Sequence, residues 1–274
     1  MTTPLKPKSN RVAGVLLALL FVALTLMFMI RGCSHRLPEV PGPAPSGGDT
    51  IDVAIEYGPL SLYRYDDTLG GFAYDFLRSI GEAEGIVFKF HPVTTLNEAL
   101  RGIDDGYYRL VVAAMPLSAS LSRDYASTRA VFLDRQVLVQ MRSDSDSVAV
   151  TSPLDLAHKT VWVMAGSPVA ERLHNLAAEI GDTINVVEDA EYGNEQLFIL
   201  AATGEIPGAV VTERTAKLLA RDYPRADIST AVSFTQFQSW LLAPGDTLLL
   251  SRLDSIITRH QSRPSYKAIH DRYL

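Results

Sequence analysis

The stretch that decides the fold is IDVAIEYGPLSLYRYDDTLGGFAYDFLRSIGEAEGIVFKF, residues 51–90. It opens with a short apolar strand, Ile51–Glu56, and then runs through a turn-rich segment. From Phe72 to Ile80 the apolar residues fall on one face of a helix, and Ile86–Phe90 forms a second strand. Strand, helix and strand in this order are typical of a βαβ unit in a mainly parallel sheet.

The same alternation of short apolar runs and helical periods continues to the end of the chain. A first series ends with a helix at 96–103 and a strand at 110–114, and a long extended segment follows at 131–141. A second series then supplies strands at 160–164, 184–187, 209–212 and 239–243, and helices near 153–157, after 168, and at 195–202, 213–223, 248–259 and 264–273. We expect crossings between two lobes near 137–140 and 237–241. The prediction is an α/β protein with lobe 1 at 50–138 and 239–274 and lobe 2 at 139–238.

An unbroken apolar run, Val12–Ile30, precedes this globular part. At about 1.5 Å per residue it just spans a hydrocarbon core of about 30 Å. Lys6, Lys8 and Arg11 lie before it, and basic residues favour the cytoplasmic side. We therefore expect a cytoplasmic segment at 1–11 and one inner-membrane helix at 12–30, with the globular domain in the periplasm.

Two other interpretations of the N-terminus remain open. A simple cleaved signal peptide has a shorter apolar region and a small-residue cleavage site, and residues 27–32 offer no clear one. Met29–Cys33 resembles a lipoprotein signal, so a lipid anchor at Cys33 is the alternative to a retained helix. The Pro/Gly-rich residues at 31–49 are typical of a linker that does not fold.

Composition and motifs exclude several classes of function. The net charge is −6 and the sequence pI is about 5.5, without a basic run beyond the N-terminal flank, so we expect no nucleic-acid partner. The single cysteine cannot form an internal disulfide, and the six histidines show no metal-ligand spacing. Phosphate-loop, dinucleotide-binding, zinc-protease and nucleophile-elbow motifs are absent from the sequence. We therefore expect no catalytic residues, no metal and no cofactor.

Several segments resemble the family 3 extracellular solute-binding proteins, which are periplasmic clamps that deliver amino acids to transporters and also form sensor modules. The matching segments are Tyr57–Leu60, Gly71–Phe76, Ala114–Ser118, Ala165–Ser167 and Tyr266–Leu274. Two others, Asp134–Gln140 and Asp227–Phe234, resemble the substrate-binding half of the membrane-bound lytic murein transglycosylase F family. In that family a catalytic domain follows the last helix predicted here. The resemblance therefore implies a two-lobed clamp with two hinge strands and no chemistry of its own.

The chain differs from the amino-acid clamps of this family at the two positions that hold the carboxylate and the ammonium of the ligand. Those clamps hold the ligand carboxylate with an arginine, because a guanidinium donates two parallel hydrogen bonds. By spacing, that position falls on Leu121, and nearby Arg123 is the alternative. The aspartate that holds the ligand ammonium corresponds to Thr212, with Glu213 next to it.

Other residues that we expect to face the space between the lobes remain as binding candidates. Tyr57 and Tyr63 have rings that stack on a sugar or apolar surface, although Tyr63 also suits a packing role. Ser61 and Ser118 have hydroxyls that donate hydrogen bonds, and Gly166 precedes a helix N-terminus suited to an anion. The predicted ligand-binding set is Tyr57, Ser61, Tyr63, Met115, Pro116, Leu117, Ser118, Arg123, Gly166, Ser167, Thr212 and Glu213.

The sequence thus predicts a membrane-tethered solute-binding domain that closes on a small extracytoplasmic ligand. The resemblance favours a peptidoglycan fragment or peptide-like solute, read by a peptidoglycan enzyme or an ABC permease. The alternative function is the amino-acid-binding component of an ABC transporter, in which Arg123 and Glu213 replace the usual anchors. A hydrolase with an unrecognised site is a third possibility.

Overall fold

The computed structural model describes residues 20, 25 and 50–274. The predicted membrane segment at 12–30, apart from Leu20 and Thr25, lies outside the described residues, as do Cys33 and the linker at 31–49. Among the residues that are described, no helix combines the length and apolar character needed to cross a bilayer.

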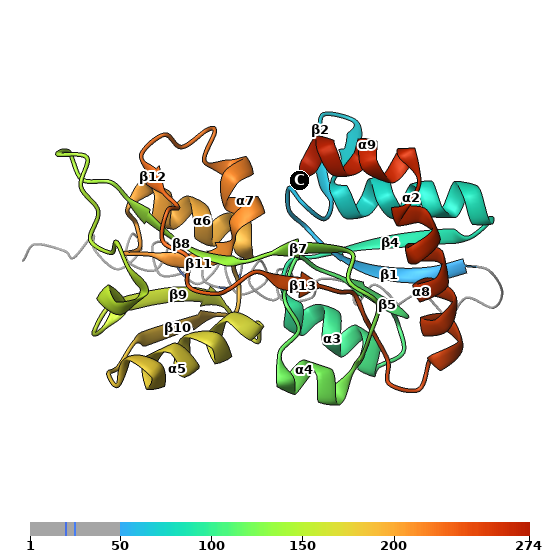
Figure 1. Cartoon of the computed structure of the whole chain (residues 1–274), viewed down its shortest axis with the longest axis horizontal. Helices are drawn as coiled ribbons and strands as arrows, with labels where there is room; N and C mark the ends of the chain where they lie inside the picture. Colours follow the sequence, from blue (N-terminus) through green and yellow to red (C-terminus); the bar gives the residue numbers. More distant parts are fainter. Residues whose placement is uncertain (1–19, 21–24, 26–49) are drawn as a thin grey trace, which may run out of the picture. The chain divides into compact units, whose positions relative to one another are not determined.

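The first lobe is built on a five-stranded sheet in the order β4-β1-β5-β14-β6 (Figure 1). The first strand runs parallel to both neighbours, with Ile55 opposite Pro92 on one side and Val112 on the other, whereas β14 is antiparallel. The strands are β1 (Thr50–Glu56), β4 (Val87–Val93), β5 (Leu110–Val112), β6 (Ala126–Ser127) and β14 (Leu241–Leu242). A separate hairpin follows β1 and consists of β2 (Tyr63–Tyr65) and β3 (Thr68–Gly70).

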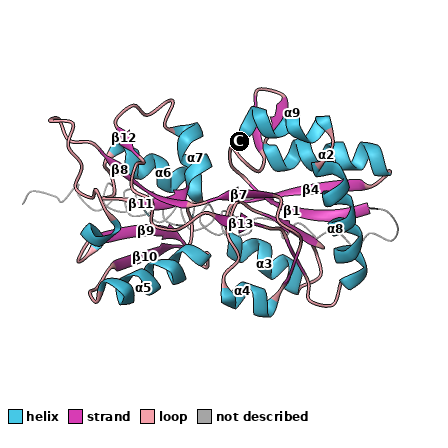
Figure 2. Cartoon of the chain, viewed as in Figure 1, coloured by secondary structure: helices cyan, strands magenta, loops and turns pink. Residues whose placement is uncertain are grey.

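Helices cover both faces of this sheet (Figure 2). The helices of the lobe are α2 (Phe72–Glu84), α3 (Leu96–Asp104), α4 (Ala119–Asp124), α8 (Thr247–Gln261) and α9 (Pro264–Tyr273). Phe72 and Phe76 of α2 pack in one buried cluster with Trp240, which confirms the helical face predicted from the sequence. Tyr273 ties α9 to α2, because its hydroxyl donates to Asp75 Oδ2 at 2.8 Å.

The second lobe repeats the plan with a sheet in the order β10-β9-β11-β8-β12. Its first three strands are parallel, and β8 is antiparallel to both β11 and β12. The elements are β8 (Gln136–Met141), η1 (Pro153–Leu156), β9 (Thr160–Met164), α5 (Pro168–Ile180), β10 (Asn185–Asp189), α6 (Asn194–Thr203), β11 (Ala209–Thr212), α7 (Glu213–Leu219) and β12 (Ala226–Asp227). The predicted two-lobed α/β fold is therefore confirmed.

Two short antiparallel strands join the lobes (Figure 1). They are β7 (Phe132–Asp134) and β13 (Gln236–Gln238), with Leu133 opposite Phe237. The chain leaves β7 at Arg135 and enters β8 of the second sheet at Gln136. The expected crossing at 137–140 thus lies inside β8, and the boundary between the lobes moves from residue 138 to Arg135. Periodicity alone cannot locate such a boundary, because hinge and sheet strands share one extended apolar pattern.

The lobes also touch each other away from the hinge. One buried apolar cluster includes Val93 and Leu96 of the first lobe together with Met164 of the second. At the rim, a Cβ on Gly193 would lie 2.9 Å from the Thr94 carbonyl oxygen, and a Cβ on Gly166 would collide with the Asn97 side chain. Gly166 also has a φ of 72°, which L side chains rarely adopt. Glycine at these two positions permits the close approach of the lobes.

Candidate ligand site between the lobes

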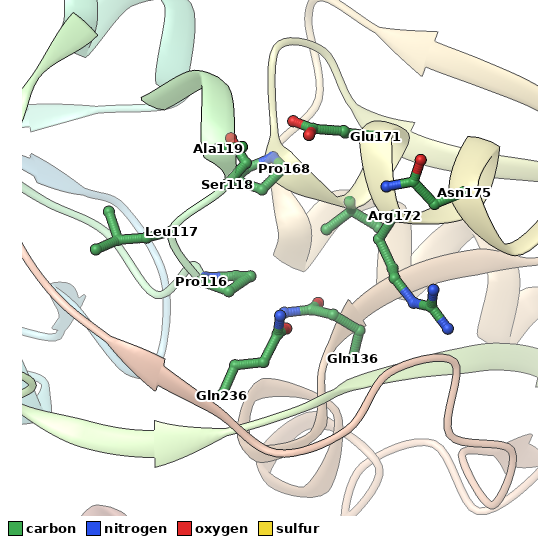
Figure 3. Close-up of a pocket in the computed structure, with 11 residues that line it drawn as sticks. Pro116, Leu117, Ser118, Ala119, Gln136, Pro168, Glu171, Arg172, Asn175 and Gln236 are labelled. Carbon is green, nitrogen blue, oxygen red and sulfur yellow. The ribbon is translucent and has the colours of Figure 1, made fainter. Parts of the chain in front are cut away.

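A cavity of about 200 Å³ lies where both lobes meet the hinge strands. The first lobe supplies Pro116–Ala119, the hinge region supplies Gln136 and Gln236, and the second lobe supplies the first turns of α5. Figure 3 shows the two glutamine side chains extending from the hinge toward the space beside Pro116. A space bounded by both lobes and the hinge is where closure of a two-lobed clamp encloses a ligand.

Polar side chains around this cavity lack hydrogen-bond partners. Gln136 is 1% exposed, and neither its Oε1 nor its Nε2 has a partner within the part of the chain the structure describes. The same holds for the hydroxyl of Ser167, which precedes the lining residue Pro168. It also holds for Oε1 of Gln238, a residue whose backbone forms an isolated β-bridge with Pro116. Buried polar groups are normally hydrogen-bonded, so these groups have binding capacity to spare.

The two charged residues of the cavity are, by contrast, already engaged. Glu171 Oε2 accepts a hydrogen bond from Ser120 Oγ at 3.0 Å, which joins α5 to the first lobe. Arg172 donates to both carboxylate oxygens of Glu179, at 2.7 and 3.3 Å, and to the Val232 carbonyl oxygen at 3.1 Å. The cavity therefore offers a ligand neutral amides and the carboxylate of Glu171, whereas its cation Arg172 is already paired with Glu179.

A wider hollow of about 670 Å³ lies at the mouth of the β2–β3 hairpin. Tyr57, Tyr63 and Tyr65 line it from the first lobe, and Glu195 and Asp222 line it from the second. Burial raises the pKa of the Glu195 carboxyl. The rings and carboxylates together suit a ligand surface with both apolar and hydrogen-bonding character.

Glu56, at the carboxyl end of β1, connects the lobes at the bottom of this region. Its Oε2 accepts from the Ala114 backbone N–H at 2.8 Å and from Ser61 Oγ at 3.5 Å. Its Oε1 accepts from Nδ2 of Asn194 in the second lobe at 2.7 Å. Burial raises the pKa of Glu56, and these three hydrogen bonds oppose the rise. The carboxyl group thus links β1 of the first lobe directly to α6 of the second.

The structure brings only part of the predicted set into these spaces. Pro116, Leu117 and Ser118 line the hinge cavity, and Tyr57, Ser61 and Tyr63 lie around the tyrosine-lined hollow or the Glu56 contacts. Ser118 is also the N-cap of α4, since its Oγ accepts from the Leu121 N–H at 3.2 Å. Met115 and Leu121 are buried in the apolar cluster instead.

The residues expected to replace the amino-acid anchors are placed differently. Arg123 is exposed on α4 and lines none of the hollows described above. The hydroxyl of Thr212 is buried and donates to Thr215 Oγ1 at 2.8 Å. Both oxygens of Glu213 are bound by Arg135, at 2.8 and 3.0 Å, and this partner lowers the pKa of Glu213. Glu213 thus ties α7 to the hinge.

The sequence reasoning missed Gln136, Gln236, Glu56 and Asn194. The sequence did contain a signal for two of them, because each is a polar residue at the end of a mainly apolar strand. Gln136 is the first residue of β8, and Glu56 is the last residue of β1. No group of three or more potential metal ligands gathers anywhere within residues 50–274.

Comparison with known proteins agrees with this architecture. The model of the bacterial extracellular solute-binding proteins, family 3, matches residues 50–274. The chain belongs to this family. The resemblance inferred from the sequence is thereby confirmed.

The curated relatives carry the name membrane-bound lytic murein transglycosylase F. That of Aeromonas hydrophila is 26% identical over 240 residues, covering 86% of this chain and 47% of the relative. That of Ectopseudomonas mendocina is 22% identical over 254 residues, covering 92% and 51%. The chain spans about half the length of these relatives, and the match covers their solute-binding half.

Solved structures share the fold at low sequence identity. An ancestral arginine-binding protein bound to glutamine superposes with a TM-score of 0.71 at 17% identity, covering 84% of this chain and 99% of the other. A histidine kinase sensor domain with similarity to periplasmic binding proteins gives 0.69 at 18% identity, covering 82% and 96%. Proteins of different types therefore share this fold.

Proposed function

We propose that residues 50–274 bind a small extracytoplasmic solute between the two lobes and signal its presence by the closed state, without catalysing a reaction. The observation that carries this proposal is the cavity bounded by Pro116–Ala119, Gln136 and α5, which draws its walls from both lobes and the hinge. A ligand shared by two lobes stabilises the closed form by its greater affinity for that form.

The favoured ligand class is a peptidoglycan fragment or another peptide-like solute. Support comes from the relatives named membrane-bound lytic murein transglycosylase F, of which this chain matches the solute-binding half. We propose that residues 12–30 hold the domain at the inner membrane on its periplasmic side, with a lipid on Cys33 as the alternative anchor. A peptidoglycan enzyme or an ABC permease would then recognise the closed conformation.

Solute binding predicts a shift in thermal unfolding. A soluble digest of peptidoglycan, added to the purified full-length chain at about ten times its dissociation constant, is expected to stabilise it by about 1.4 kcal/mol. For a domain of this size that corresponds to a rise in Tm of about 3–6 °C. Differential scanning fluorimetry measures the shift. If neither the digest nor free amino acids change the Tm, the proposal is contradicted.

The second candidate function, an amino-acid receptor of an ABC transporter, rests on the fold shared with arginine-binding proteins. It predicts that free amino acids raise the Tm and that Arg123→Ala abolishes the rise, because Arg123 would then hold the ligand carboxylate. On our proposal Arg123→Ala leaves solute binding unchanged, since this side chain is exposed outside the cavity.

A further inference from the structure

The backbone of Gln136 is fixed by hydrogen bonds, whereas its side-chain amide makes none among the described residues. Its backbone N–H donates to Ser233 Oγ at 2.9 Å, and its carbonyl oxygen accepts from the Val232 N–H at 2.9 Å. The amide at its tip is buried, lines the hinge cavity and lacks a partner among residues 50–274. Leaving both ends of a buried amide unpaired is costly, so the arrangement indicates a group meant to bind something else.

The surroundings of this amide disfavour an anionic ligand group. Arg172, the cation of the cavity wall, is held by Glu179 and the Val232 carbonyl oxygen. The positive end of α5 is also compensated, because Pro168 has no N–H and the acidic Glu171 lies in the first turn. A ligand carboxylate here would lose its water without gaining a free cation, which is strongly unfavourable.

We infer that the hinge cavity recognises a neutral secondary amide of the ligand through Gln136. An amide has one N–H donor and one carbonyl acceptor, and Gln136 offers the complementary acceptor and donor. Gln236 and Asn175 line the same space with further neutral amides (Figure 3). This inference rests on the proposed function and narrows its ligand class.

The size of the cavity limits what enters it. Pockets for whole drug-sized ligands usually measure about 300–1,000 Å³. At about 200 Å³, this cavity accommodates the end of a larger ligand. A secondary amide at such an end is either an acetamido group on a sugar or a peptide unit, and the two are separated by experiment.

The test uses isothermal titration of the purified full-length chain with four probes. N-acetylglucosamine and glucosamine form one pair, and N-acetylalanine amide and alanine amide form the other. We expect the acetylated member of at least one pair to bind at least ten times more tightly than its free amine. Preference in the first pair identifies an acetamido sugar, and preference in the second identifies a peptide unit.

Two variants separate amide recognition from packing. Gln136→Leu preserves the bulk of the side chain but removes both polar atoms, and is expected to weaken binding of the preferred probe at least ten-fold. Gln196→Leu, on α6 outside the cavity lining, is the matched control and is expected to bind as the wild type does. Circular dichroism checks that both variants fold.

Wild-type affinity in Gln136→Leu, or tighter binding of the free amines, would overturn the inference. If a peptidoglycan digest raises the Tm while no acetylated probe binds, the inference fails and the proposed function stands. If neither the digest nor any probe or amino acid binds, the proposed function fails as well.

Discussion

Replacing Glu56 with alanine is expected to lower the free energy of unfolding by about 2–4 kcal/mol. The change leaves the Ala114 N–H and the Asn194 amide without their acceptor, and each unpaired buried group costs roughly 1–3 kcal/mol. Because Asn194 belongs to the second lobe, the change also removes a direct bond between the lobes. Urea denaturation measures the stability, and small-angle X-ray scattering measures the expected rise in radius of gyration.

Two further variants make this prediction specific. Asn194→Ala removes only the bond between the lobes and is expected to cost about 1 kcal/mol while opening the clamp to the same extent. Glu56→Gln retains one acceptor oxygen and is expected to lie between the two alanine variants. A Glu56→Ala protein with the stability and radius of the wild type would show that this contact does not hold the lobes together.

Stability is expected to rise as the pH falls from about 7.5 to about 5, and Asp134 supplies about 1.4 kcal/mol of that rise. Burial at the hinge raises the pKa of this carboxyl from 3.8 to about 6, although the Arg135 N–H and the nearby Arg214 oppose the shift. The folded state therefore binds a proton that the unfolded chain has already released. The contribution is fully present below the unfolded value and is lost as the pH passes the folded value.

Asp134→Asn carries no ionisable group and is expected to flatten this pH dependence by that amount. Some dependence remains, because burial also raises the pKa of Glu56 and Glu195. Urea denaturation at a series of pH values gives the comparison, with the exposed Asp124→Asn as the matched control. Equal slopes in the wild type and Asp134→Asn would contradict the assignment.

Most of the fold was predictable from the sequence because its signal is local. The helical face that begins at Phe72 and the apolar strand Thr160–Met164 are each read within a single segment, and both are present. The crossing at Arg135 was misplaced by a few residues, since hinge strand and sheet strand look alike in the sequence. Apart from Leu20 and Thr25, the segment at 12–30 lies outside the described residues, so the membrane helix stays a prediction.

The residues that line the candidate site were predictable only where they follow a strand end. Pro116–Ser118 lie in the cavity as that rule suggests. Thr212 and Glu213 follow a strand end too, but local partners occupy their side chains. A strand end therefore indicates where a residue lies without telling whether its side chain is free.

By itself, the sequence determined two α/β lobes, an extended connection between them and the family to which the chain belongs, because apolar periodicity and short motifs are properties of neighbouring residues. Tertiary structure alone decided which polar groups remain available. Glu56 is bound by residues 58 and 138 positions away, and Gln136 lines a space with residues from both lobes while its amide stays unpaired. Whether a buried group is satisfied depends on distant partners, and the order of residues along the chain does not record them.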